Sequence, residues 1–292
     1  MRKELKMDLK ALQEMPPWEW PGDTDEQLLK ILRDPGAGDA DRIIAAELAG
    51  GFTVVNDPVA DELLAIVRNA AESDDIRARA AISLGPALEQ AWTAEFDDPD
   101  EVPISEPMFH KIQAVLREVY SDKTVPKPVR RRVLEAAVRA PEDWQADAIR
   151  QAFLSDDRDW QITALFGMQH VRGFDKQILT ALASPDSDIQ FEAVRAAGER
   201  EVDAAWPHLL RFLADRRTDK PTLLAIFDAV SKIRSGEAFA VLDPFTHNHD
   251  REIAEAAEEA IGAAQAYSAG EGMEDEEEWD EEEDEDKDGW VN

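Results

Sequence analysis

A pattern of small and apolar residues recurs along the chain at intervals of about 31 residues. In the stretch "SPDSDIQFEAVRAAGE", Ile189 is followed four, five and eight residues later by Ala193, Val194 and Ala197. The same spacing begins at five further anchor residues, which are Ile76, Val129, Trp160, Pro221 and Ile253. From the second of these onward, the anchors are 31, 29, 32 and 32 residues apart. Offsets of four, five and eight fall on one face of an α-helix, so each period is predicted to contain an amphipathic helix.

A second amphipathic segment precedes several of these helices, and Ile149, Ile178 and Leu209 hold matching places in three of them. The joins "SDDRD", "SPDSD" and "DRRTDKP" supply Asp and Ser, which are good N-cap residues. One such helix pair cannot bury its apolar face alone, whereas stacked neighbours can. We therefore expect an all-α fold, a right-handed α-solenoid of about seven helix–turn–helix repeats.

Three segments are expected along the chain. Residues 1–24 form an N-terminal cap in which Trp18 and Trp20 pack on the first repeat, residues 25–265 form the solenoid, and residues 266–292 form a disordered acidic tail. A faint copy of the pattern at Asp39–Gly51 belongs to the first repeat. The gap of 53 residues between the anchors Ile76 and Val129 indicates an insertion at Glu95–Pro107.

Two segments, "DDIRARAAISLG" and "DSDIQFEAVRAAG", resemble the HEAT repeat. They share Asp at the turn, an Ile followed by Arg or another polar residue, Ala at offset four and a closing Leu-Gly or Ala-Ala-Gly. The whole chain resembles the short stand-alone HEAT-repeat proteins of bacteria, most of which have no assigned activity. The resemblance implies a binding scaffold with a concave face lined by the second helices, and it implies no reaction. The small Ala at offset four is then a site of close helix contact.

The formal charge of −32 restricts the partners that the chain can take. Residues 271–292 hold 14 Asp or Glu and one Lys, so this segment contributes −13 and the remainder keeps −19. Such a body repels phosphate backbones, and we expect no nucleic-acid partner. The sequence has no Cys, which excludes disulfides, thiolate metal sites and a Cys nucleophile. It also lacks a secretory signal and an apolar run of membrane-spanning length, so we expect a cytoplasmic protein with no membrane partner.

Few residues suggest chemistry. His247, His249 and Asp250 lie close together in "THNHD", but a metal site needs three or four ligands, and we interpret the segment as a polar turn. No nucleotide-binding, hydrolase or metalloprotease motif occurs, and no carboxylate pair stands out among so many. We therefore expect no catalytic residue, no metal site and no cofactor, and we do not expect an enzyme.

The acidic tail contains part of a calcium-binding pattern. Asp284, Asp286, Asp288 and Gly289 match the first half of an EF-hand loop, but the sequence stops before the Glu that would complete it. Weak association of divalent ions with the tail is an alternative to a purely solvating role. Aromatic residues within acidic runs can dock on basic, apolar surfaces, which leaves open a role for the tail as a tethered ligand.

Two surfaces are candidate binding sites. A basic segment runs from Lys111 to Arg139, and its centre, Arg130, Arg131 and Arg132, is a candidate anion patch for an acidic partner or for the tail residues Glu274–Asp288. The alternative is a solvated helix face. Offsets two and six of three consecutive repeats form a candidate partner-binding groove, whose apolar members are Ile162, Phe166, Phe191, Leu223 and Phe227. The alternative is packing between repeats.

The leading hypothesis is a non-catalytic protein–protein interaction scaffold that binds a partner peptide or protein on its concave face. Two alternatives stay open: a HEAT-like enzyme of the lyase or glycosylase type, and an ion-binding role through the acidic tail. A glycosylase needs a strongly basic concave face, whereas this sequence has one basic patch. The partner, the oligomeric state and the pathway do not follow from the sequence.

Overall fold

The computed structural model describes residues 8–51, 53–96 and 102–267. The chain divides into two compact units, Met1–Val171 and Arg172–Asn292. Within the described residues all regular structure is helical and no strand occurs. The expected fold class is confirmed, because successive helix–turn–helix pairs stack in each unit as in an α-solenoid. The acidic tail expected at residues 266–292 lies outside the described residues from 268 onward.

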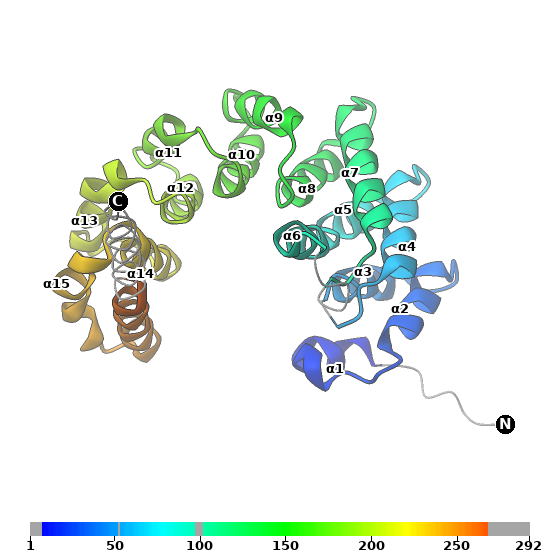
Figure 1. Ribbon diagram of the computed structural model, residues 1–292, viewed down its shortest axis with the longest axis horizontal. Coiled ribbons are helices and arrows are strands. Elements are labelled where there is room, and N and C mark those ends of the chain that lie inside the picture. The colour runs from blue at the N-terminus through cyan, green and yellow to red at the C-terminus, as the bar shows by residue number, and fades with distance from the viewer. Residues whose placement is uncertain (1–7, 52, 97–101, 268–292) are drawn as a thin grey trace, which may run out of the picture. The chain divides into compact units, whose positions relative to one another are not determined.

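The first unit has two layers of helices (Figure 1). The first helices of its four pairs are α2 (Thr24–Arg33), α4 (Asp57–Arg68), α7 (Glu106–Ser121) and α9 (Asp143–Phe153). The second helices are α3 (Asp39–Leu48), α5 (Asp74–Ser83), α8 (Lys127–Ala137) and α10 (Arg158–His170). Each second helix packs on its own first helix and on the second helix of the next pair. The second helices therefore form one continuous layer within this unit.

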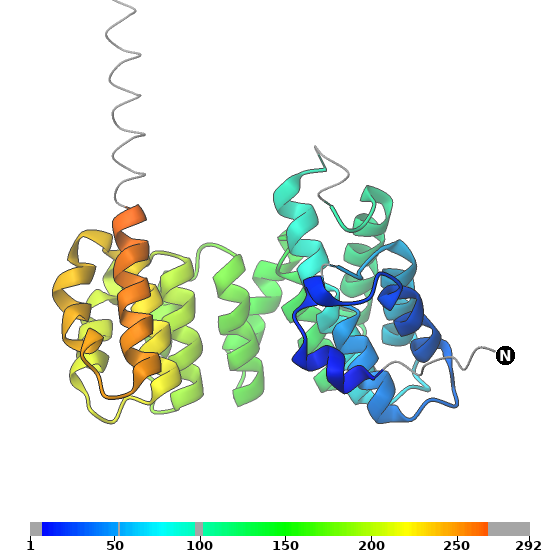
Figure 2. The same cartoon turned by 90° about the horizontal axis from the view of Figure 1, so that it is seen from below.

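The second unit repeats this arrangement. It contains the pairs α11 (Asp175–Ala181) with α12 (Ser187–Glu199) and α13 (Trp206–Ala214) with α14 (Lys220–Ile233). A short 3-10 turn, η2 (Asp203–Ala205), precedes α13. The last pair consists of α15 (Ser235–Thr246) and a helix over residues 251–267, which lies beside α15 in Figures 1 and 2. The seven pairs in the described residues match the expected number of repeats.

The N-terminal segment packs on the first repeat, but through one tryptophan rather than two. It contains α1 (Leu9–Glu14), which contacts α3, and the 3-10 helix η1 (Pro17–Glu19). The indole Nε1 of Trp20 donates to the carbonyl oxygens of Leu12 and Met15, at 3.1 and 3.0 Å. The expectation that Trp18 also packs is wrong, because its residue is 79% exposed.

The insertion between the second and third repeats begins earlier than expected. Helix α6 (Gly85–Ala94) follows α5 directly and packs on α8 and α7. Pro86 stands in the first turn of α6, where its missing N–H is tolerated. The extra segment therefore includes a packed helix as well as Glu95–Pro107, of which residues 97–101 lie outside the described residues.

The N-caps of the second helices define the register of the repeats. The side chains of Ser73, Asp157, Asp186 and Asp219 each accept a hydrogen bond from the backbone N–H three residues later. Those third residues are Ile76, Trp160, Ile189 and Thr222. In the sixth repeat the sequence-based anchor, Pro221, is thus one residue too early. Pro221 is exposed, whereas Thr222 is buried and is followed at offsets four, five and eight by Ile226, Phe227 and Val230, all buried.

An arginine directly after the anchor links the two helices of each of the first three pairs. Arg42, Arg77 and Arg130 donate to carbonyl oxygens ten residues earlier, at 3.1, 3.0 and 2.9 Å. The acceptors are Leu32, Val67 and Tyr120, each the second-last residue of the preceding first helix. Carbonyl groups at helix C-termini have no partner within the helix and interact favourably with cations. The Arg of the repeated pattern therefore has a structural role in these pairs.

Ion pairs one repeat apart join neighbouring pairs. Arg42 forms two hydrogen bonds of 2.7 Å with the carboxylate of Glu72, and both side chains are largely buried. This contact lowers the pKa of Glu72, chiefly through the hydrogen bond from Arg42. Lys220 pairs with Asp250 at 2.8 Å in the second unit. Such bidentate and clustered pairs hold adjacent repeats in register.

Consecutive second helices approach so closely that only very small residues fit at the contact. A Cβ atom added to Gly50 would lie 2.6 Å from the carbonyl oxygen of Ser83, and one added to Gly198 would lie 2.9 Å from the Cα of Ala229. With Asp41 as the anchor of the first repeat and Ile189 as that of the fifth, both glycines stand at offset nine. Their partners stand at offset seven of the next repeat, counted from Ile76 and Thr222. Gly262 holds offset nine in the last described repeat, where an added Cβ would meet no atom within 4 Å.

This difference predicts opposite effects for the same substitution. Gly198→Ala should lower the free energy of unfolding by about 1–2 kcal/mol, because the contacting atoms belong to backbone and cannot move aside cheaply. Gly262→Ala should raise it by roughly 0.5–1 kcal/mol, because Ala favours the helix and no clash offsets the gain. Urea denaturation followed by circular dichroism measures both. Changes of the same sign in the two variants would contradict the proposed helix contact.

Candidate interaction groove

The expected apolar stripe is incomplete in the second unit because of the register of α14. Phe227 is 1% exposed and packs with its ring centroid 5.1 Å from that of Phe245, so it belongs to the core rather than to a groove. Leu223 is half-buried at offset one, the position that faces the first helix in other repeats. With Thr222 as the anchor, offsets two and six are Leu224, which is half-buried, and Asp228, which is exposed. Both α14 residues expected in the groove are thus misplaced by one position.

The other stripe residues are half-buried, and the two phenylalanines among them each have an arginine over the ring. Phe166 of α10, in the first unit, lies under the guanidinium of Arg139, at 5.4 Å from its ring centroid. Ile162 lies one turn earlier on the same helix. Phe191 of α12, in the second unit, has Arg195 over its ring at 5.8 Å. The five expected residues therefore divide between the two units.

Arg130, which was expected in the anion patch, is engaged in helix packing instead. Its Nε donates to the Tyr120 carbonyl at 2.9 Å, and its guanidinium lies over the rings of Tyr120 and Trp160, at 5.2 and 5.5 Å from their centroids. Burial raises the pKa of the Tyr120 hydroxyl, and the charge of Arg130 opposes this shift. The side chain thus completes the packing between α7, α8 and α10.

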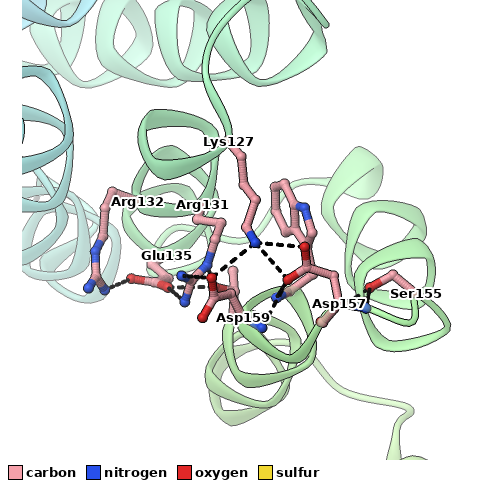
Figure 3. A network of polar contacts seen from close by, with 9 residues as sticks. Lys127, Arg131, Arg132, Glu135, Ser155, Asp157 and Asp159 are labelled. Carbon is pink, nitrogen blue, oxygen red and sulfur yellow. Dashed lines mark hydrogen bonds and ion pairs between the residues drawn. The ribbon is translucent and has the colours of Figure 1, made fainter. Parts of the chain in front are cut away.

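Arg131 and Arg132 of α8 share one buried carboxylate, that of Glu135 on the same helix (Figure 3). Arg131 donates through Nε to the Thr163 hydroxyl at 2.9 Å, and this hydroxyl donates to Glu135 at 2.6 Å. Arg132 also pairs with Glu135. The Arg131 side chain is 16% exposed and the Arg132 side chain 48% exposed. Glu135 therefore fixes both guanidinium groups, while Arg132 is the one that a ligand can reach more easily.

Lys127, at the first turn of α8, joins this cluster to the next repeat (Figure 3). Its Nζ lies 2.6 Å from the carboxylate of Asp157 and 3.0 Å from that of Asp159. Hydrogen bonds to these two carboxylates raise the pKa of Lys127. The same contacts lower the pKa of Asp157 and of Asp159. These groups stay charged near neutral pH and hold α8 against α10.

A groove of about 500 Å³ opens on the second-helix layer of the first unit, between α3, α5 and α8. Its aliphatic lining consists of Ile43, Ala78, Ile82 and Pro128. Its charged lining consists of Arg79, Arg131, Arg132 and Asp75. The lining residues therefore include three cations and one carboxylate. Carboxylates beside the lining pair with these cations: Glu47 with Arg79, Glu135 with Arg131 and Arg132, and Asp159 with Arg131. We refer to this groove below as the α5–α8 groove.

Sequence reasoning found Arg131 and Arg132 but missed the other half of this groove. Arg79 and Ile82 of α5 stand at offsets three and six from Ile76, and Ile43 of α3 stands at offset two from Asp41. These offsets belong to the same helix face that the stripe analysis used in later repeats. Applying the repeat register to the earlier helices would have found them. The outward positions of α3 and α5 therefore follow from the repeat register, whereas their meeting with α8 in one groove does not.

Within the described residues, the remaining candidate positions do not come together as a metal-binding site. His247 and His249 are exposed beside Asp250, whose carboxylate pairs with Lys220. No group of three or more His, Asp or Glu residues that could hold a metal ion occurs in the part of the chain that the structure describes. The half EF-hand at Asp284–Gly289 lies outside that part. Among the described helices, none combines the length and the apolar character that crossing a bilayer requires.

The chain matches no protein-family model and no curated protein sequence. Among solved structures, Escherichia coli YibA is similar at a TM-score of 0.45 with 17% sequence identity, over 87% of this chain and 85% of that one. Human deoxyhypusine hydroxylase, solved in complex with glycerol, is similar at a TM-score of 0.40 with 16% identity, over 88% of each chain.

The Lys127 contacts predict a pH-dependent effect of Asp157→Asn. Asn still caps α10, but it removes the charge that pairs with Lys127. Because folding lowers the pKa of Asp157, the stabilisation is present above the unfolded pKa of about 3.9 and is lost as the pH falls through the lower folded value. The variant should melt below the wild type at pH 6, and the difference should shrink at pH 3.

Both pH values avoid the sequence pI of about 4.4, where the protein carries little net charge. Differential scanning calorimetry measures the two melting temperatures. Asp147→Asn is the matched control, because Asp147 pairs within its own helix, with Arg150. A melting difference for Asp157→Asn that is as large at pH 3 as at pH 6 would contradict the role of the charge.

Proposed function

We propose that the protein is a non-catalytic interaction scaffold that binds a segment of a partner protein in the α5–α8 groove. The observation that carries the proposal is the composition of this groove, an aliphatic floor flanked by three arginines in a chain of charge −32. The chemistry favours a segment in which Asp or Glu stands next to Leu, Ile or Val. Concave faces of helical repeats commonly bind extended or helical peptides in this way.

The arginines favour a segment that carries anionic groups. A guanidinium offers planar paired donors that match a carboxylate, and Arg131 and Arg132 are already held in place by Glu135. Side chains that are ordered before binding lose less entropy when a ligand arrives. Single-stranded nucleic acid would call for aromatic rings on which bases stack, and the groove lining contains no aromatic residue. The strong negative charge of the whole chain also opposes a phosphate backbone.

The groove lining supports binding rather than catalysis. It contains one carboxyl group, Asp75, and no His, Ser, Thr or Lys that could act as a base or nucleophile. Elsewhere, a general acid would need a raised carboxyl pKa. The carboxyl groups of Glu72, Asp203 and Asp250 instead have lowered pKa values, first of all because of hydrogen bonds from a neighbouring Arg or Lys. Arg217 likewise lowers the pKa of Asp215 to about 2.

The test selects peptides from a random 12-residue display library on the immobilised full-length protein. Selected peptides should be rich in Asp or Glu next to aliphatic residues. Their synthetic forms are then titrated calorimetrically into wild-type protein and into three full-length variants. Arg132→Gln and Ile82→Gln should each weaken binding by about tenfold or more, because they remove a central cation and part of the apolar floor.

Arg150→Gln is the matched control, since its side chain is 53% exposed on α9 and its ion pair is with Asp147. This variant should bind the peptides within about twofold of wild type. Circular dichroism verifies that all variants keep their helical content. Selection of no acidic peptides, or equal binding by wild type and Arg132→Gln, would overturn the proposed function.

A further inference from the structure

The segment beyond the described residues is opposite in charge to the arginines of the α5–α8 groove. Residues 271–292 carry a net charge of −13 and include Trp279 between Glu278 and Asp280. The segment thus combines clustered carboxylates with a large apolar side chain. Residues 268–292 lie outside the described part of the chain.

The charges of the lining residues favour the α5–α8 groove over two other cavities of the described residues. Its lining has three Arg and one Asp, a formal balance of +2. A second cavity, in the second unit, is lined by Arg211 and Arg217 against Asp215 and Asp219, a balance of zero. A third, on α7, has Arg117 against Glu118 and Glu142, a balance of −1 with its His neutral. Most of the surface must repel the tail, because the chain without it still carries −19.

We propose that tail residues 274–288 occupy the α5–α8 groove and compete there with partner segments, as an autoinhibitory contact. The inference rests on the proposed function in that it uses the same groove. Covalent attachment raises the effective concentration of the tail, so a weak contact within one chain is populated where the linker can reach. The groove arginines are partly exposed, so high salt should screen the contact strongly.

The direct test places a spin label on the tail. The sequence has no Cys, so Glu285→Cys creates a unique labelling site in the full-length chain. At low salt, the label should broaden the backbone amide signals of Ala78, Arg79, Arg131 and Arg132 in nuclear magnetic resonance spectra. The broadening should disappear in about 0.5 M salt, where the screening length falls to a few ångströms.

Two controls make this result specific. The label should leave the amides of Gln113 and Arg117 on α7 unaffected, and Arg150→Gln should leave the broadening of the groove unchanged. Arg132→Gln should reduce it. Spectra of dilute and of concentrated samples distinguish docking within one chain, which is independent of concentration, from docking between chains. Absence of groove broadening at low salt, at both concentrations, would overturn the tail contact.

A second measurement separates this inference from the proposed function. In a full-length variant, Glu281, Glu282, Glu283 and Glu285 are replaced by Gln and Asp284 by Asn. The peptides selected above should bind this variant at least threefold more tightly than wild type, because the competing charges are removed. If they bind both proteins equally, the tail inference fails while the function stands. If the tail reaches the groove but no peptide is selected even on this charge-neutralised variant, the function fails while the tail contact stands.

Discussion

The close approach of consecutive second helices is the constraint on which the rest of the structure depends. At Gly50 and Gly198 the next helix lies so near that a single methyl group would meet backbone atoms. Helices packed this closely cannot slide or rotate without a clash, so each repeat is locked in one register with the next. The register in turn determines which offsets are buried and which face outward. Gly50 thereby sets the register of α3 against α5, the two helices that supply Ile43, Ala78 and Ile82 to the groove.

Position within the repeat, rather than residue type, decides what each arginine does. Arg130 at offset one completes helix packing through the Tyr120 carbonyl. Arg131 and Arg132, at offsets two and three, turn to the other face and line the groove. Three consecutive residues of one type therefore have two different roles. Glu135 links them to the core, because a nearly buried carboxylate must keep its cationic partners.

Much of the fold could be predicted from the sequence, because the same residue pattern occurs in several repeats and each copy supports the same helix assignment. The period, the Asp and Ser caps and the buried offsets agree in most repeats, and only the sixth was assigned in the wrong register. There Pro221 appeared to be an apolar anchor, although proline in a first helical turn needs no buried position. Counting three residues from the Asp219 cap gives Thr222 and corrects the error. Helix α6 was missed because it belongs to no repeat.

Less of the candidate groove could be predicted. The cations of α8 were visible as a run, but the groove also needs Arg79 and Ile82 of α5, which are remote in sequence. Residue type alone was also misleading at Trp18, which is exposed, and at Phe227, which is buried. An aromatic residue in a sequence does not by itself reveal whether its side chain is exposed. Side-chain partners such as Glu135, which decide how free a cation is, follow only from the three-dimensional arrangement.

Thiol accessibility on α5 tests most directly whether the repeat register creates the binding surface. Ala78→Cys and Ala80→Cys are the same substitution two residues apart, in a chain without other cysteines. Ala78 lines the groove, whereas Ala80 is 0% exposed. A thiol reagent should modify Cys at 78 rapidly and Cys at 80 orders of magnitude more slowly, and an acidic peptide selected on the protein should slow only the first reaction. Equal rates at the two positions, or no protection at 78 by bound peptide, would contradict the account.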